Sequence, residues 1–111
     1  ELLGLVQEVR KVHMTDAVLD YVTTLVEKTR NHPQVALGVS PRGALAVCRM
    51  AKAFAYLYGR DFVMPEDVAA IFPDVCAHRL MLNSKARMME EKPENVLAEI
   101  LKSTDMPVLK K

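Results

Sequence analysis

A chain of 111 residues with fifteen basic and fourteen acidic side chains has the size of a single domain and a net charge of only +1. This balance argues against a nucleic-acid or membrane-surface partner. Half of the residues are hydrophobic, but there is no tryptophan and only three are phenylalanine and three tyrosine. We therefore expect one packed core of leucine, valine, alanine and methionine, a composition that favours helices.

The first third of the chain predicts two helices. Hydrophobic residues recur at helical spacing over residues 1–11 and again over 15–30, where a threonine is the expected N-cap. Asp16 and Arg30, near the two ends of the second helix, have the charges that the helix dipole favours. Residues 12–14 are expected to be an extended link between the two helices.

The stretch from residue 38 to 60 carries the strongest helix signals. Ser40 is a good N-cap, Pro41 suits the first helical position, and an apolar run ends at Gly59, the expected left-handed residue past a helix end. The polar side chains of this helix fall on one side: Arg42, Arg49, Lys52 and Tyr56. We expect the buried centre of a bundle with a single solvated stripe.

The second half of the chain predicts shorter elements. Pro65 opens a helix with two acids in its first turn, of which Asp67 is interpreted only as matching the helix dipole. Pro73 is expected to interrupt this helix, so that residues 74–78 follow at an angle. The remaining expectations are extended pieces over 61–63 and 79–82, a mobile loop over 83–92 and a last helix over 94–102.

Together these elements predict an all-α fold, a small helical bundle of about five helices with short extended connectors. No strand is expected to be long enough to build a sheet. Residues 1–111 are interpreted as one domain, with 104–111 as a frayed tail. Because the chain starts without methionine and inside an apparent helix, we expect it to be a fragment of a longer protein.

Cysteine usage and hydropathy indicate the compartment. Cys48 and Cys76 lie in apolar surroundings without the spacing of metal ligands, which favours two buried, reduced thiols in a cytoplasmic protein over a disulfide. No apolar run of about 18 residues lacks charge, so no transmembrane span is expected. No signal peptide is visible either.

Patterns of catalytic and metal-binding residues are missing from the sequence. There is no G-x-x-x-x-G-K-[ST] loop to bind a nucleotide unaided. His13, His32 and His78 are far apart and have no partner at the spacing of a zinc site. Neither cysteine has a neighbouring histidine that would make a thiolate nucleophile. We expect no metal site and no catalysis by these residues alone.

Arg42 is the sharpest functional signal. It lies in the first turn of the central helix, where the dipole favours acids and disfavours cations. A bound anion would use both its guanidinium and the free amides of that turn. Residues 31–60 also hold four basic side chains and no acid. The simpler alternative is a capped helix with a bystander arginine.

Two motifs resemble the C-terminal lid domain of MoxR-family AAA+ ATPases. These are GVSPRGA over residues 38–44 with the Ala-rich helix behind it, and GRDFVMPEDV over 59–68 followed by HRL at 78–80. Residues 12–30 are similar to the first lid helix of the family. The resemblance covers residues 5–103 and implies a small helical bundle that follows a nucleotide-binding α/β core.

The resemblance implies a role for the start of the central helix. In the family, the arginine of the Ser-Pro-Arg start is the sensor-2 residue, which reaches the γ-phosphate of ATP. Here that residue is Arg42, with Ser40, Pro41 and Gly43 beside it at the nucleotide. ATP and Mg²⁺ would be held mainly by the core domain, which is absent from this chain.

The resemblance also implies partners and a whole-protein activity. Lid rotation on hydrolysis would transmit force through a hexameric ring of neighbouring subunits. Family members are expected to act in chaperone-like remodelling or metal insertion, often beside proteins with von Willebrand factor A domains. The P-loop, the Walker B acids and the arginine finger lie outside this chain. The isolated domain should hydrolyse nothing, and the parent protein is expected to be the ATPase.

One residue departs from the family pattern, and two other functions stay open. Met64 replaces the usual threonine, so the helix at Pro65 loses a side-chain cap, at a cost of about 1 kcal/mol at most. The first alternative function is a stand-alone nucleic-acid-binding module, since residues 61–68 are also similar to histone-fold elements. The second is a protein-interaction bundle in which Arg42 is only a surface residue.

Overall fold

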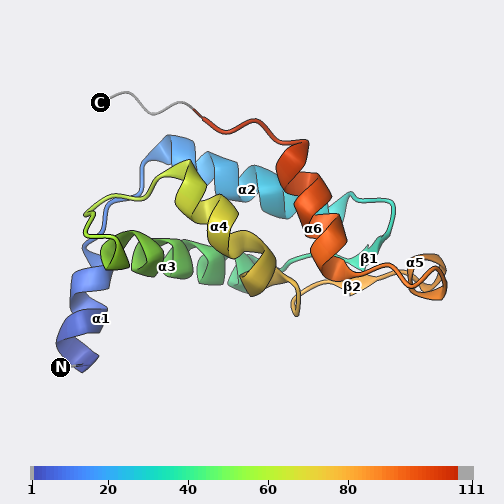
Figure 1. Cartoon of the computed structure of the whole chain (residues 1–111), viewed down its shortest axis with the longest axis horizontal. Coiled ribbons are helices and arrows are strands. Elements are labelled where there is room, and N and C mark those ends of the chain that lie inside the picture. The colour runs from blue at the N-terminus through green and yellow to red at the C-terminus, as the bar shows by residue number, and fades with distance from the viewer. Residues whose placement is uncertain (1, 108–111) are drawn as a thin grey trace.

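Six helices and one small antiparallel sheet make up the described part of the chain, residues 2–107, in a computed structural model (Figure 1). In chain order the elements are α1 (Leu2–Arg10), α2 (Asp16–Arg30), β1 (Val35–Leu37), α3 (Pro41–Leu57), α4 (Pro65–Cys76), β2 (Met81–Leu82), α5 (Ser84–Met88) and α6 (Pro93–Lys102). The predicted all-α bundle is confirmed. No helix in this part of the chain is long and apolar enough to cross a membrane.

The core lies between α2, α3, α4 and α6. α3 and α4 make the most extensive contact, α6 packs against both α2 and α4, and α1 packs against the C-terminal half of α3 (Figure 1). The largest fully buried side chains are Phe72, Leu25 and Leu97, and most of the others are valine or alanine. The expected aliphatic core is therefore present, but its expected methionines are not, because no methionine of the described residues is buried.

α3 differs from the expectation of a buried centre with a single solvated stripe. Its buried residues, Gly43, Val47, Ala51 and Ala55, form a single stripe of small side chains at intervals of four. Small residues at this spacing let α4 approach closely. The other faces stay accessible, and Leu45, Met50 and Leu57 are exposed. The prediction of one solvated polar stripe on an otherwise buried helix is wrong.

The predicted break at Pro73 is also wrong, because α4 continues through this proline to Cys76. Proline lacks the N–H that would bond the carbonyl four residues earlier. The ladder resumes at once, since the Ala77 N–H donates to the Pro73 carbonyl over 2.9 Å. Val68, Phe72 and Cys76 are fully buried on one face of α4. Burial of this face outweighs the loss of one helical hydrogen bond.

Two extended segments pair where no sheet was predicted. β1 and β2 are antiparallel, with Val35 opposite Leu82 and Leu37 opposite Met81. The predicted links 12–14 and 61–63 also pair, because His13 exchanges backbone hydrogen bonds with Asp61 and Val63 over 2.8 Å each. Strands this short are stabilised by partners distant in sequence, so local patterns do not reveal them.

The segment 83–92, predicted as a mobile loop, contains α5. Asn83 is its N-cap, and its Oδ1 accepts from the Ala86 N–H over 2.9 Å. The Asn83 amide nitrogen donates to the Pro33 carbonyl over 2.8 Å, which ties this helix to the β1 end of the fold. Ala86 is the buried residue of α5, so the segment carries almost no hydrophobic pattern.

Candidate functional site

The start of α3 brings together the residues predicted from the sequence. Ser40 is the N-cap, and its Oγ accepts from the Gly43 N–H over 3.2 Å. Pro41 occupies the first helical position, as predicted. The Arg42 side chain is exposed, and it belongs to no ion pair among the described residues. A cation is therefore placed without a counter-charge at the positive end of a helix.

Fewer amides of this turn are free than the sequence suggested. Pro41 has no N–H, the Gly43 N–H is bonded to Ser40, and the Ala44 N–H donates to the Ser40 carbonyl over 3.0 Å. Among the amides of residues 41–44, only the backbone N–H of Arg42 has no hydrogen-bond partner within residues 2–107. An anion at this turn would thus be held mainly by the guanidinium, with one amide in support.

Gly43 is buried, and its small size is a packing requirement. A Cβ at this position would lie 2.5 Å from Val39 Cγ1 and 3.3 Å from Arg79 Cδ. The Arg79 stem therefore runs past the first turn of α3 at Gly43. Arg79 is exposed and follows α4. Sequence reasoning noted Arg79 only as part of a motif.

Two residues of α2 hold the loop that leads into α3, and sequence reasoning missed both. The Thr29 hydroxyl accepts from the Val39 N–H over 3.0 Å and donates to the Val26 carbonyl over 2.6 Å. The Nε of Arg30 donates to the Val39 carbonyl over 3.1 Å. Both backbone polar groups of Val39 are thereby satisfied by one neighbouring helix. This Thr29–Arg30 latch fixes the position of the turn that carries Arg42.

Gly38 lets the loop pass close to this latch. A Cβ there would lie 2.7 Å from the Cα of Arg30. No side chain could be accommodated without moving backbone, so the loop and the end of α2 are fitted to each other. No local sequence pattern reports such a contact, because the two segments are eight residues apart and belong to different elements.

The far end of α3 is held by an ion pair. Arg60 forms two hydrogen bonds to Asp67, Nη1 to Oδ2 over 2.6 Å and Nη2 to Oδ1 over 2.5 Å. The Asp67 side chain is 3% exposed and that of Arg60 24%. The bonds to Asp67 raise the pKa of Arg60 above its usual value. The interpretation of Asp67 as a merely dipole-matched acid is therefore incomplete.

Asp67 also forms a hydrogen bond to the backbone of Met64, the N-cap residue of α4. The Met64 side chain forms no cap, as expected, but the Met64 N–H donates to Asp67 Oδ2 over 2.7 Å. One carboxylate thus satisfies the N-cap amide and neutralises Arg60. The turn between α3 and α4 is closed by a charged group that is bonded on both oxygens.

The two cysteines are free thiols with raised pKa values. Cys76 is buried, and burial raises its pKa to about 12. Cys48 is only half-buried, in contrast to the prediction; burial raises its pKa and nearby Lys52 partly offsets this effect. Neither thiol is activated as a nucleophile. Within residues 2–107, no group of three metal-ligating side chains is close enough to hold a metal ion.

The sequence and the fold both match known proteins. The AAA lid domain family matches residues 27–100. The chain is 38% identical over 108 residues to the uncharacterized protein YeaC of Bacillus subtilis, covering 97% of this chain and 34% of that protein. It is also 38% identical over 100 residues to the chaperone MoxR1 of Mycobacterium tuberculosis, covering 82% of this chain and 26% of that protein.

A solved structure shares most of this arrangement. The crystal structure of a "putative ATPase" from Cytophaga hutchinsonii superposes with a TM-score of 0.86 at 27% identity, covering 92% of this chain and 34% of that one. The chain thus spans about a third of the length of the first relatives it matches. Because the family match covers residues 27–100 and further relatives are MoxR proteins of Methylorubrum extorquens and Paracoccus denitrificans, this chain belongs to the AAA lid domain family, as a C-terminal lid of the MoxR-type AAA+ ATPases.

Proposed function

We propose that this lid closes over ATP held on a core domain of the same, longer polypeptide, and that Arg42 contacts the γ-phosphate. The observation that carries the proposal is the exposed Arg42 guanidinium at the first turn of α3, without an ion-pair partner in the described part of the chain. The chain spans only 34% of YeaC and 26% of MoxR1, which supports the existence of such a core.

Electrostatics supports this role for Arg42. A cation in the first turn of a helix is disfavoured by about 0.3–1 kcal/mol, and a phosphate beside it turns this cost into an attraction. The Thr29–Arg30 latch holds the turn in place before any ligand arrives. Less conformational entropy is then lost when the guanidinium engages an anion.

The chemistry of such a contact is charge stabilisation. During phosphoryl transfer, negative charge spreads over the oxygens of the transferred group, and a fixed guanidinium lowers the energy of that state. Arg79, whose stem passes the same turn, adds to the positive potential. The described residues offer no metal cluster, so Mg²⁺ belongs to the core in this proposal.

The assembly, output and compartment that we propose for the whole protein rest on its resemblance to MoxR-family ATPases. Lid movement would couple ATP binding and hydrolysis to a ring of neighbouring subunits, expected to be a hexamer. The output would be chaperone-like remodelling or metal insertion, together with von Willebrand factor A domain proteins. Two free thiols are compatible with the cytoplasm as the compartment. The nucleic-acid alternative is set aside, because the family shown is an AAA lid.

The proposal is tested by replacing Arg42 in the complete ATPase. We expect Arg42→Ala to lower the turnover number about 10²–10³-fold, because a donor to the transition state is lost. Arg87→Ala removes an exposed arginine of α5 and serves as the matched control. ATP binding is measured separately by titration, so that loss of affinity is distinguished from loss of turnover. Unchanged turnover in Arg42→Ala would overturn the role of Arg42.

A further inference from the structure

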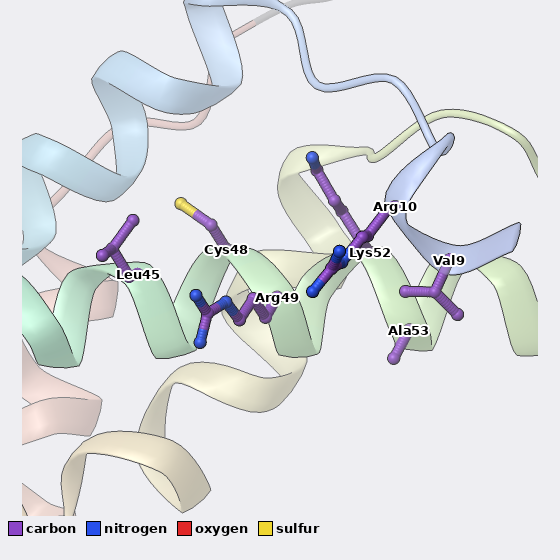
Figure 2. Close-up of a pocket in the computed structure, with 7 residues that line it drawn as sticks. All are labelled: Val9, Arg10, Leu45, Cys48, Arg49, Lys52 and Ala53. Atoms are coloured by element: carbon purple, nitrogen blue, oxygen red, sulfur yellow. The ribbon is translucent and has the colours of Figure 1, made fainter. Parts of the chain in front are cut away.

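A groove follows the accessible side of α3. Its first part is a hollow of about 610 Å³ where the end of α1 meets α3 (Figure 2). Its second part, about 420 Å³, lies between α2 and α3 and shares two lining residues with the first, Leu45 and Cys48. The two hollows adjoin along α3 from Pro41 to Ala53. At 1.5 Å per residue this is about 18 Å, or three helical turns. We call the joined feature the α3 groove.

Cations line the first part of the α3 groove. Figure 2 shows Arg10 from α1 and Arg49 and Lys52 from α3 around the same hollow. No carboxylate is among the described residues that line this first part, and Glu27 and Arg30 both line the second part. Opposite charges usually accompany such side chains on a protein surface, as Glu8 accompanies Lys11 here. Three cations gathered without an acid create a positive potential that attracts a negatively charged partner.

The floor of the α3 groove is apolar and accessible. Leu45, shared by both parts, is 56% exposed, and Leu19, from α2, is 45% exposed. Val9 and Ala53 continue this surface beside the cations. An apolar floor with a charged rim is the chemistry of a groove that receives one face of an amphipathic helix.

We propose that the α3 groove binds an amphipathic helix with acidic residues along its flank, supplied by a separate partner protein. Its apolar face would cover Leu45 and Leu19, and its acids would pair with Arg49, Lys52 and Arg10. The groove length matches about three turns of such a helix.

A second copy of this chain fits the groove poorly. The apolar faces of α4 and α6 are already buried in the core of their own domain, and two grooves that faced each other would bring the like-charged Arg49 and Lys52 side chains together. The cations also lie beyond the Arg42 turn. Arg49 and Ala53 are about 10–16 Å further along α3, so the cationic part of the groove lies away from a nucleotide at Arg42, whereas the second part of the groove begins at Pro41, in the same turn as Arg42. Charge pairing at Arg49 and Lys52 therefore does not require a contact between Arg42 and a nucleotide.

The test uses two synthetic peptides of about 15 residues. One places leucines on one helical face and glutamates beside them, and the other replaces every glutamate with lysine. Because the protein has no tryptophan, binding is followed by fluorescence anisotropy of labelled peptide. We expect the acidic peptide to bind with a Kd on the order of 10–100 μM, and the basic peptide at least about tenfold more weakly.

Matched variants locate the binding surface. The double variant Arg49→Glu/Lys52→Glu should weaken binding of the acidic peptide at least about tenfold. The double variant Arg87→Glu/Lys102→Glu makes the same charge change elsewhere on the surface and should leave binding unchanged. Arg49→Ala is the milder replacement if the double variant folds poorly. Bound peptide should also slow alkylation of Cys48 at fixed pH, while buried Cys76 stays unreactive throughout.

Four results would overturn the proposal. The peptides could bind equally well, or neither could bind at about 1 mM. The chain could self-associate through the groove, shown by sedimentation and abolished by the double variant, which would make a second copy the occupant. Cys48 could be protected in the complete ATPase without any peptide, which would assign the groove to the rest of the same polypeptide.

Discussion

The two ends of α3 use arginine in opposite ways. At its start, Arg42 is exposed and unpaired within the described residues, on a turn whose backbone is fastened to α2. Past its end, Arg60 is bonded twice to the buried carboxylate of Asp67. One arginine closes the fold, and the other is held in position with its guanidinium available. Charge alone therefore does not distinguish the two arginines, and the proposal for Arg42 rests on its lack of a partner on a turn that is bonded to α2.

The largest expected effect on stability is at the Arg60 end. Asp67→Ala leaves Arg60 without its carboxylate and removes the acceptor for the Met64 N–H. We expect the free energy of unfolding to fall by about 3 kcal/mol, less than for a fully buried pair because Arg60 is partly exposed. Urea unfolding measures this free energy, and Glu66→Ala, at an exposed neighbouring residue, is the control. A loss no larger than that of the control would show that the ion pair is not structural.

At the Arg42 end of α3, the stability of the domain should depend on packing rather than on charge. Gly43→Ala places a Cβ 2.5 Å from Val39 Cγ1 and should destabilise the domain by about 1–3 kcal/mol. Gly4→Ala is the matched control, because nothing lies within 4 Å of a Cβ there and alanine favours helix α1. Thermal unfolding compares the two. Equal midpoints would mean that the first turn of α3 is not tightly packed.

The Thr29–Arg30 latch should have a smaller effect on stability. Thr29→Val keeps the shape of the side chain but leaves the buried Val39 N–H without an acceptor. We expect a loss of about 1–2 kcal/mol. Exposed Thr24→Val is the control. Hydrogen exchange of the Val39 amide should become faster in Thr29→Val, and unchanged protection of that amide would contradict the latch.

The elements with local signals could be predicted from the sequence. Thr15 and Ser40 cap α2 and α3 as expected, and Gly59, at φ 76°, follows the end of α3. Arg42 could be proposed from the sequence for the same reason, because a cation in a first turn is visible in the sequence itself, and its role stays a prediction.

The features that were missed depend on contacts between distant segments. α5 is anchored to Pro33 by Asn83, fifty residues later in the chain. The continuation of α4 through Pro73 depends on burial of one helix face, which outweighs the local cost of proline. The Thr29–Arg30 latch and the pairing of Arg60 with Asp67 each join a helix to a nearby loop, and no helical or strand periodicity reports such a contact. The exposure of Leu45 could not be foreseen, since an apolar helix predicts burial.

Turnover and stability measured together on Arg42→Ala and Arg60→Ala test the central claim most directly. The complete ATPase gives the turnover number, and urea unfolding of the 111-residue chain gives the stability. We expect Arg42→Ala to lose about 10²–10³-fold in turnover with stability unchanged or slightly raised. Arg60→Ala should instead destabilise the lid by about 2–3 kcal/mol. Full turnover with Arg42→Ala would contradict the account, because it would show that the Arg42 guanidinium does not stabilise the transition state of phosphoryl transfer.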